Sequence, residues 1–482
     1  MKGITFVHLK SRRCPVAILL LSALALPAHA AIFTDTPNSP RADAVAASNT
    51  LDLAQAYARM LYNDPQIKSA TAARDAGRDE SGIARAALLP QASITYLRNR
   101  TDLKENMTQS TGIAGLPDEH YQVKEKFYGK RAGITVEQSL FDYSAISTYR
   151  IGKTQAQYAD VQYRLQLQQE AVTLIDTYLN ALLARDTLQL AQYQLQVYED
   201  MLRDNQRLID RGEGTRIDTL ETRAQISATR SELIKDENDL KDRLGELSAL
   251  VGEPVQPQQL MAINLQHGLL PLQRLDLPTL LKDANEQNPQ MQAARLSVQY
   301  SDLTIEKAKG EFMPKVSAFA SREHIESDNI DNIGRDYYDN TIGIQVSIPL
   351  FNGGSSYYTA RQAYSRREQA QYELEHTSNS TATLLEQYFR VTDTSLSRIR
   401  TLRQNVTESE DLVQAMRRSV AGGERTNTDA LQAERQAFQA RLALIRSYVE
   451  WFQAYGKLQF YAGRFSEDDI VVLNRQLVMA RQ

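Results

Sequence analysis

The chain has 482 residues, is 42% hydrophobic and contains one Trp and one Cys. Its glutamine-rich helical stretches favour long amphipathic helices over a compact enzyme core, and its length fits two to four ordinary domains or one large elongated domain. The formal net charge of −4 gives no electrostatic case for nucleic-acid binding.

Residues 1–30 read as a secretory signal peptide, with basic residues before an apolar core and Ala28-His29-Ala30 as the cleavage site. Cys14 precedes the apolar core, so it is not placed as a lipoprotein acceptor. Cleavage removes four basic residues, which leaves a cysteine-free mature chain of formal charge −8. No later run approaches the length of a transmembrane helix.

Residues 31–252 read as a first structural repeat, which begins with a loosely ordered leader over 31–50. A helix is predicted up to Pro90, where the hydrophobic period changes from about 3.6 to 2. This change predicts a β-hairpin over 91–141, with two strands of about ten residues and a polar loop of about thirty residues between them. Two long helices are then predicted, over 143–209 and 215–251.

Apolar residues recur every seven positions along these helices, which predicts seams that pack against neighbouring helices. The clearest seam is Leu188, Leu195, Leu202 and Ile209.

A turn and a new helix cap follow this seam. Gly212 and Gly214 break the first long helix, and Thr215 with Asp218 gives the T-x-x-D spacing of a capping box. The same pattern returns 211 residues later, at Gly422, Gly423, Thr426 and Asp429.

The rest of the second half repeats the first, from 279 to 463, after a linker over 253–278. Its elements are a β-hairpin over 315–350, a long helix over 355–420 and a helix over 426–462, and residues 464–482 form a C-terminal tail. Prolines, glycines and caps agree at a near-constant offset, which indicates a tandem duplication.

Four strands in one chain cannot close a membrane barrel. Ile342, Ile344, Val346 and Ile348 alternate strictly and are expected to face lipid. Since open sheet edges are not tolerated in lipid, membrane strands would require several chains to share one barrel. A hairpin on a soluble sheet is the alternative interpretation, and the hairpin over 91–141 taken alone favours it.

Several segments resemble the TolC family of outer-membrane channel-tunnels, and the resemblance covers residues 50–463. The segments are ARAALLPQASITY, EQSLFDYSA, SIPLFNGGSS, RGEGTRIDTLETRAQ and GGERTNTDALQAERQ. The resemblance implies an α+β membrane protein that forms a homotrimer, with a shared twelve-stranded barrel in the outer membrane and a twelve-helix tunnel through the periplasm. It also implies a periplasmic adaptor protein and an inner-membrane pump, of the ABC or another type, docking at the glycine-containing tips.

The family's periplasmic aperture is held shut by Asp, Arg and Tyr side chains beside the tips. By position, Asp218, Arg425 and Asp429 match gate residues, whereas Gln432 replaces a second ring aspartate and Val420 replaces the gate tyrosine. A single acidic ring is therefore expected. The alternative for both aspartates is helix capping, worth about 0.3–1 kcal/mol.

No catalytic, cofactor-binding or metal-binding constellation is recognised, because the histidines are scattered and no nucleophile or phosphate-binding motif occurs. The predicted function is an outer-membrane export duct. The missing lipoprotein cysteine favours type I protein secretion, with exported protein as the cargo, over the alternative of small-molecule efflux. A periplasmic coiled-coil adaptor is the remote alternative.

Overall fold

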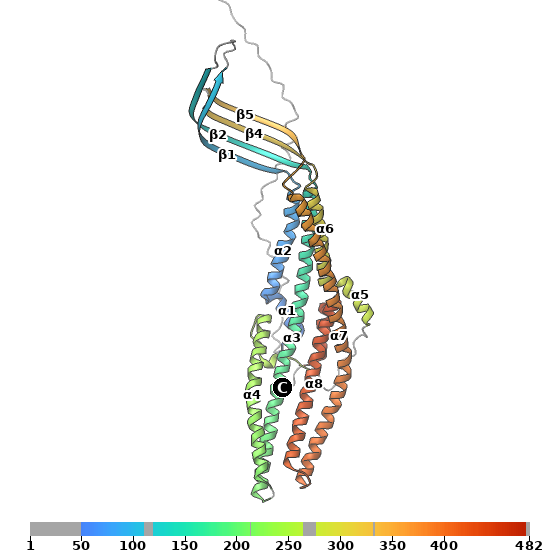
Figure 1. The fold of residues 1–482 in the computed structure, drawn as a ribbon. Helices are drawn as coiled ribbons and strands as arrows, with labels where there is room; N and C mark the ends of the chain where they lie inside the picture. The colour runs from blue at the N-terminus through green and yellow to red at the C-terminus, as the bar shows by residue number, and fades with distance from the viewer. Residues whose placement is uncertain (1–49, 110–118, 213, 264–275, 331–332, 479–482) are drawn as a thin grey trace, which may run out of the picture. The chain divides into compact units, whose positions relative to one another are not determined.

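The computed structural model (Figure 1) describes residues 50–109, 119–212, 214–263, 276–330 and 333–478. These residues all belong to one compact unit, Thr50–Gln482. The expected signal peptide and the leader up to residue 49 lie outside the described residues. Within the described ranges, no helix is both long enough and apolar enough to cross a membrane.

Four long strands form one antiparallel sheet in the order β1-β2-β4-β5 (Figure 1). The pairing of β2 with β4 joins the hairpins of the two repeats. β1 and β5 are left as the edges of the sheet. The strand bounds are Gln91–Gln109 for β1, Glu119–Phe141 for β2, Lys315–Ile330 for β4 and Ile333–Ser347 for β5.

β1 and β2 are about twice as long as the ten residues that the sequence suggested, and β4 and β5 have 16 and 15 residues. β1 pairs with β2 from Gln91 opposite Glu137 to Gln109 opposite Glu119, so most of the expected thirty-residue loop is strand. The expectation of short strands with long loops is wrong in both hairpins, and β5 ends at Ser347 instead of residue 350. Charged side chains replace apolar ones on one face beyond residue 97, which hides the alternation although the backbone ladder continues.

One face of the sheet carries an apolar band, because residues directly opposite one another in an antiparallel pair share a face. In β1 and β2 the band reaches Tyr96 and Ala132, in the row that His324 and Tyr338 complete. In β4 and β5 it lies nearer the helices, so the band runs obliquely across the strands. Tilted strands in a membrane barrel produce such a slant. The band consists of Ala92, Ile94, Tyr96, Ala132, Ile134, Val136, Val316, Ala318, Ala320, Ile342, Ile344 and Val346.

The described residues of the two repeats include eight helices. The two longest have 68 and 67 residues, which corresponds to about 100 Å each at 1.5 Å per residue. The first repeat holds α1 (Leu53–Asn63), α2 (Pro65–Ala86), α3 (Tyr143–Asp210) and α4 (Arg216–Val251). The second holds α5 (Leu277–Gln287), α6 (Pro289–Gly310), α7 (Ser355–Ala421) and α8 (Asn427–Ala462).

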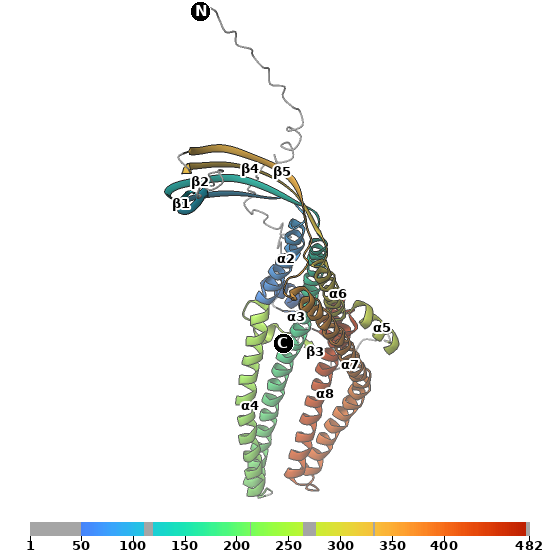
Figure 2. The same ribbon diagram turned by 45° about the horizontal axis from the view of Figure 1, so that its top comes forward.

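The helices are arranged side by side in a consistent order (Figures 1 and 2). Near the sheet, the contacts follow the order α2-α3-α6-α7, and near the tips they follow α4-α3-α8-α7. The sheet, the helices near the sheet and the helices near the tips are called the three tiers. One edge of each tier is therefore an element of the first repeat: β1, α2 or α4. The other edge is an element of the second repeat, β5 or α7.

The short helices of each repeat meet end to end beside the long ones. The Asn63 side chain donates to the Val251 carbonyl at 2.8 Å, and Asn288 donates to the Tyr461 carbonyl at 2.9 Å. Gly252 and Gly463 end α4 and α8 in the left-handed region, where a Cβ atom would collide with these asparagines. Both copies thus use one kind of junction.

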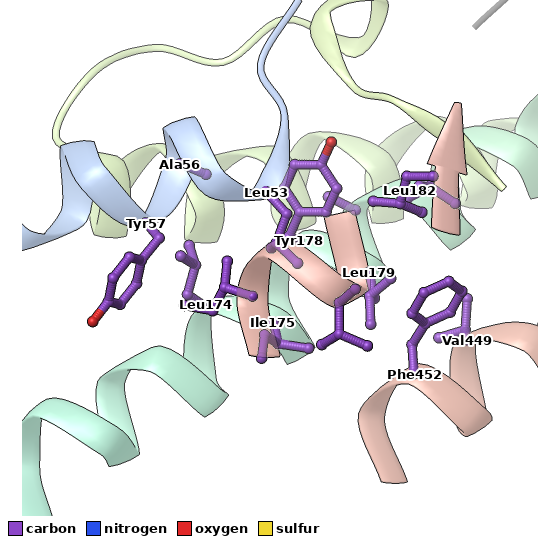
Figure 3. Packing of buried hydrophobic residues seen from close by; sticks show 14 of the residues in the cluster. Leu53, Ala56, Tyr57, Leu174, Ile175, Tyr178, Leu179, Leu182, Val449 and Phe452 are labelled. Carbon is purple, nitrogen blue, oxygen red and sulfur yellow. The ribbon is translucent and has the colours of Figure 1, made fainter. Parts of the chain in front are cut away.

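The main hydrophobic core lies at these junctions, where α1, α3 and α8 meet (Figure 3). Tyr178 is fully buried there, and its hydroxyl accepts from the Met261 amide at 3.0 Å and donates to the Leu51 carbonyl at 2.8 Å. Burial raises the pKa of Tyr178 far above that of a free tyrosine.

The linker and the tail contribute to this core. β3 (Ala262–Ile263) in the linker pairs with β6 (Leu477–Val478) in the tail, after α9 (Glu467–Gln476). Linker residues 264–275 lie outside the described residues. The segment expected only as a C-terminal tail contains α9, and its Ile470, Leu473 and Leu477 are buried in the core.

Candidate gate at the helix tips

The first tip joins α3 to α4. Gly212 adopts φ of +79°, and the Gly214 amide donates to the Leu208 carbonyl at 3.1 Å. A Cβ atom on Gly214 would lie 2.9 Å from the Ile209 nitrogen, so this position requires a glycine for close backbone approach.

A capping box starts α4. Asp218 accepts from the Thr215 amide at 3.1 Å, and the Asp218 amide donates to the Thr215 hydroxyl at 3.3 Å. The predicted cap is therefore present, and the Asp218 carboxylate is engaged within its own turn.

The second tip joins α7 to α8 with a related turn. Gly423 takes φ of +76°, and the Glu424 amide donates to the Ser419 carbonyl at 2.9 Å. Gly422 has helical dihedrals and caps α7. Thr426 and Asp429 repeat the box, with 3.1 Å from the Thr426 amide to the Asp429 carboxylate.

Arg425 and Gln432 are exposed beside this second box. Hydrogen bonds from the Thr426 amide and hydroxyl, with a smaller contribution from the Arg425 charge, lower the pKa of Asp429. Arg425 therefore acts on Asp429 electrostatically within one tip. Asp218 and Asp429, on α4 and α8, each bond within their own turn.

Other residues join the two tips. The Thr428 hydroxyl donates to the Glu221 carboxylate at 2.5 Å, and the side-chain amide of Asn427 donates to the Thr222 hydroxyl at 3.3 Å. Thr222 also accepts from Asn205 of α3 at 2.9 Å, and both Thr222 and Asn205 are buried. These two contacts between α4 and α8 are called the inter-tip bridge below.

Apolar packing supports the inter-tip bridge. Tyr198, Ile226 and Leu431 come from α3, α4 and α8 and form a buried cluster, against which Leu195 and Leu202 of the predicted seam pack. The seam residues themselves are only partly buried.

An ion pair holds α7 to α8 inside the second hairpin. The Arg417 guanidinium donates to Glu434 through Nε at 2.8 Å. The side chain of Glu434 is only 6% exposed, whereas that of Arg417 is 54% exposed. The carboxylate therefore depends on this one partner for compensation of its lost hydration.

Sequence reasoning missed the inter-tip bridge and the ion pair. Asn205, three positions after Leu202, offered a signal, because it places an amide beside an apolar seam. Glu221 lies 211 positions before Gln432 and is its counterpart in the first repeat. The family has an acidic residue at the position of Gln432, and in this chain the acidic residue stands at the first-repeat counterpart instead. Nothing local marked Thr428 as its partner.

No group of three or more potential metal-ligating side chains occurs within the described ranges.

The family model described as "Outer membrane efflux protein" matches residues 56–253 and 280–464. The chain therefore belongs to this family, the TolC family of outer-membrane channel proteins, as the tip and strand motifs indicated. As such it is a channel protein of the outer membrane that extends into the periplasm.

Two curated relatives are each 31% identical to the chain. One is the alkaline protease secretion protein AprF of Pseudomonas aeruginosa, with 89% of this chain and 88% of AprF covered. The other is the proteases secretion protein PrtF of Dickeya chrysanthemi, with 88% of this chain and 91% of PrtF covered. The solved structure of the outer membrane protein VceC from Vibrio cholerae shares the fold, with a TM-score of 0.69 at 16% identity over 85% of this chain and 96% of VceC.

Proposed function

We propose that this chain is the outer-membrane duct of a type I protein-secretion system that exports a secreted protease. The observation that carries the proposal is its similarity, over nearly the whole length, to two proteins named for protease secretion. Small-molecule efflux is the alternative, supported by the family description.

The working form is a homotrimer in this proposal. Each tier of the single chain ends in one first-repeat edge and one second-repeat edge, so a copy of the same chain fits each edge. β5 would pair with β1 of the next copy, α7 would pack on its α2 and α4, and three copies would supply twelve strands and twelve helices. A periplasmic adaptor and an inner-membrane pump would engage the tips around Gly212, Gly214, Gly422 and Gly423.

Secretion in reconstituted cells tests the proposed cargo class. Cells that lack their own duct receive this chain together with the pump, adaptor and substrate protease of a type I system. Protease in the medium, with none when the chain is omitted, is the expected result. Restored resistance to small toxic compounds without any protease export would contradict type I secretion and favour efflux.

The gate proposal concerns Asp218, Arg425 and Asp429, with Gln432 leaving one acidic ring. Three copies of each aspartate near one axis would repel one another and concentrate cations, and Arg425 would offset part of that repulsion. Arg425→Ser is expected to raise single-channel conductance in planar bilayers, and Asp429→Asn is expected to weaken cation preference. If both variants conduct and select like the wild type, these residues only cap their helices.

The membrane face is tested at Ile344, whose side chain is 69% exposed. Ile344→Arg should cost about 2–4 kcal/mol in a lipid bilayer and impair assembly. Thr341→Arg and Gln345→Arg place the same charge on the opposite face of β5 and serve as controls. Equal damage from the controls would mean that the face is misassigned.

A further inference from the structure

Beyond the apolar band, the same face of the first hairpin becomes strongly basic. The period of two along β1 and β2 places six cations on this face, and all six are exposed or half-exposed. Asp102 is the one acidic residue that β1 contributes among them. They are called the basic ladder: Arg98, Arg100, Lys104, Lys124, Lys126 and Lys130.

The register of the ladder sets like charges directly against each other. Lys104 is opposite Lys124, and Arg98 is opposite Lys130. Directly opposite Cβ atoms lie about 5 Å apart, and like charges at that spacing destabilise a strand pair. The chain has a negative net charge, yet it places two such like-charge pairs within one hairpin. An anion bound from outside would therefore reduce the electrostatic repulsion in these pairs.

Internal partners neutralise only part of the ladder. Lys126 pairs with Asp102 at 3.5 Å, and Lys130 pairs with Glu326 at 3.0 Å. Arg100 lies over the ring of Tyr128 at 5.8 Å. Among the side chains that the structure describes, no carboxylate forms an ion pair with Lys104, Lys124 or Arg98.

The ladder is continuous with the surface that meets lipid. Arg98 follows Tyr96 of the apolar band at the next position on that face, about 7 Å further along the strand. Lys104 lies about 20 Å beyond Arg98. On the opposite face of the same ribbon, Leu103 and Phe127 are only half-exposed, so the cations occupy the more open side.

We propose that the basic ladder binds the phosphate groups of glycolipids in the outer leaflet of the outer membrane. The sheet lies at the end of the helices opposite the tips (Figure 1). Because β1 starts at Gln91, just after α2, its band residues come first along the strand and its ladder residues lie farther from the helices. The ladder therefore faces the outer leaflet and the space directly above it. A glycolipid that carries phosphates on its lipid-anchored sugars and on further sugars fits a ladder that extends about 20 Å from the band.

The test measures binding of purified, detergent-solubilised full-length protein to two probes in phosphatidylcholine nanodiscs. One probe is diphosphorylated lipid A, and the other is the same lipid extended by phosphorylated core sugars. Arg98→Gln with Arg100→Gln should weaken binding to both probes by about 25-fold, since each cation near an anionic surface contributes about fivefold. Lys104→Gln with Lys124→Gln should weaken only the extended probe by a similar factor.

A control pair removes two charges from the opposite face of the sheet, as Arg131→Gln with Arg335→Gln, and should leave both affinities unchanged. Wild-type binding should also fall as salt rises, because these charges are exposed. Equal affinities for wild type and both ladder variants, or equal losses in the control, would overturn the proposal.

Lipid-free detergent provides a readout with the opposite sign. Lys104→Gln with Lys124→Gln removes a like-charge pair, so the thermal midpoint should rise. A fall in the midpoint would overturn the proposal, because the lysines would then be compensated inside the protein. Native mass spectrometry of the Arg98→Gln with Arg100→Gln variant is a further test. Dissociation of the oligomer would show that these two cations contact a neighbouring copy, and would overturn the proposal for the part of the ladder next to the apolar band.

Discussion

The two helix tips have the same turn chemistry but differ in what holds their helices together. Both have a left-handed glycine and a Thr-Asp capping box with the same 3.1 Å bond. The first hairpin is fastened by the neutral Asn205–Thr222 bond, and the second by the Arg417–Glu434 ion pair. Duplication thus preserved the local rules of the turn, while the packing beneath it diverged.

Counterparts 211 positions apart make this divergence specific. Arg417 and Glu434 correspond to Gln206 and Arg223, which cannot form the same pair. Asn205 and Thr222 correspond to Met416 and Ala433. Arg425 corresponds to Gly214, so the side chain proposed for the gate exists only at the second tip. Each difference supplies a variant with a matched control.

Breaking the ion pair is expected to have the largest effect. Arg417→Met leaves the buried Glu434 carboxylate without its partner and should lower the unfolding free energy of the second tip by about 2–3 kcal/mol. Hydrogen exchange of α7 and α8 amides near the tip measures this. Gln206→Met at the corresponding position should cost less than about 0.5 kcal/mol. Equal protection in both variants would show that the pair contributes nothing to tip stability.

Crowding the first turn comes next. Gly214→Ala forces a Cβ atom against the Ile209 nitrogen and should cost about 1–3 kcal/mol in the exchange of α3 end amides. Gly422→Ala is the control, because its nearest neighbour would be an ordinary 3.6 Å away. Similar costs at both glycines would mean that the close approach at Gly214 relaxes freely.

Replacing first-tip residues by their second-tip counterparts should cost a comparable amount of stability after one substitution. A second substitution should restore it. Thr222→Ala alone leaves the buried Asn205 side-chain amide with only the longer contact to the Asp218 carbonyl, at 3.4 Å, and should cost about 1–3 kcal/mol. Asn205→Met added to it reproduces the counterpart pair Met416 and Ala433, and should restore most of the stability of α3 and α4. A double variant no more stable than the single one would refute the hydrogen-bond explanation.

Acid should produce the smallest effect, at the second box. Because the folded helix lowers the pKa of Asp429, its capping contribution is complete above the ordinary carboxyl pKa of about 3.9 and is lost as pH falls through the lower folded value. Arg425→Ser removes one of the causes, so the loss should begin at a higher pH, as measured by exchange at the start of α8. An unchanged pH profile would remove Arg425 from this role.

Local chemistry explains how much of this structure was predictable. The T-x-x-D spacing and glycines at each tip specify a turn and a cap within a few residues, and both were recognised from sequence. The inter-tip bridge joins residues more than 200 positions apart, such as Glu221 and Thr428, and depends on how α4 packs beside α8. No periodicity in either helix encodes that approach.

In the sheet, too, one part of the structure was predictable from the sequence and another part was not. The apolar alternation of Ile342, Ile344 and Val346 was readable, because lipid selects apolar side chains at every second position. Beyond the band, cations such as Arg98 and Lys104 occupy those positions, so the strands resembled polar loops. In the tail, Ile470, Leu473 and Leu477 had helical spacing that marked a buried element, and this signal was overlooked.

The gate proposed at the tips requires α4 and α8 to move apart when the duct opens, and cross-linking the two tips tests this most directly. The one cysteine, Cys14, lies in the expected signal peptide, so Glu221→Cys with Thr428→Cys introduces the only thiols of the mature protein. A short thiol-reactive cross-linker across this pair should abolish protease secretion and hold single-channel conductance at its closed value. Arg417→Cys with Glu434→Cys, cross-linked within one hairpin, should still secrete. Undiminished secretion by the protein cross-linked between Glu221→Cys and Thr428→Cys would contradict the account.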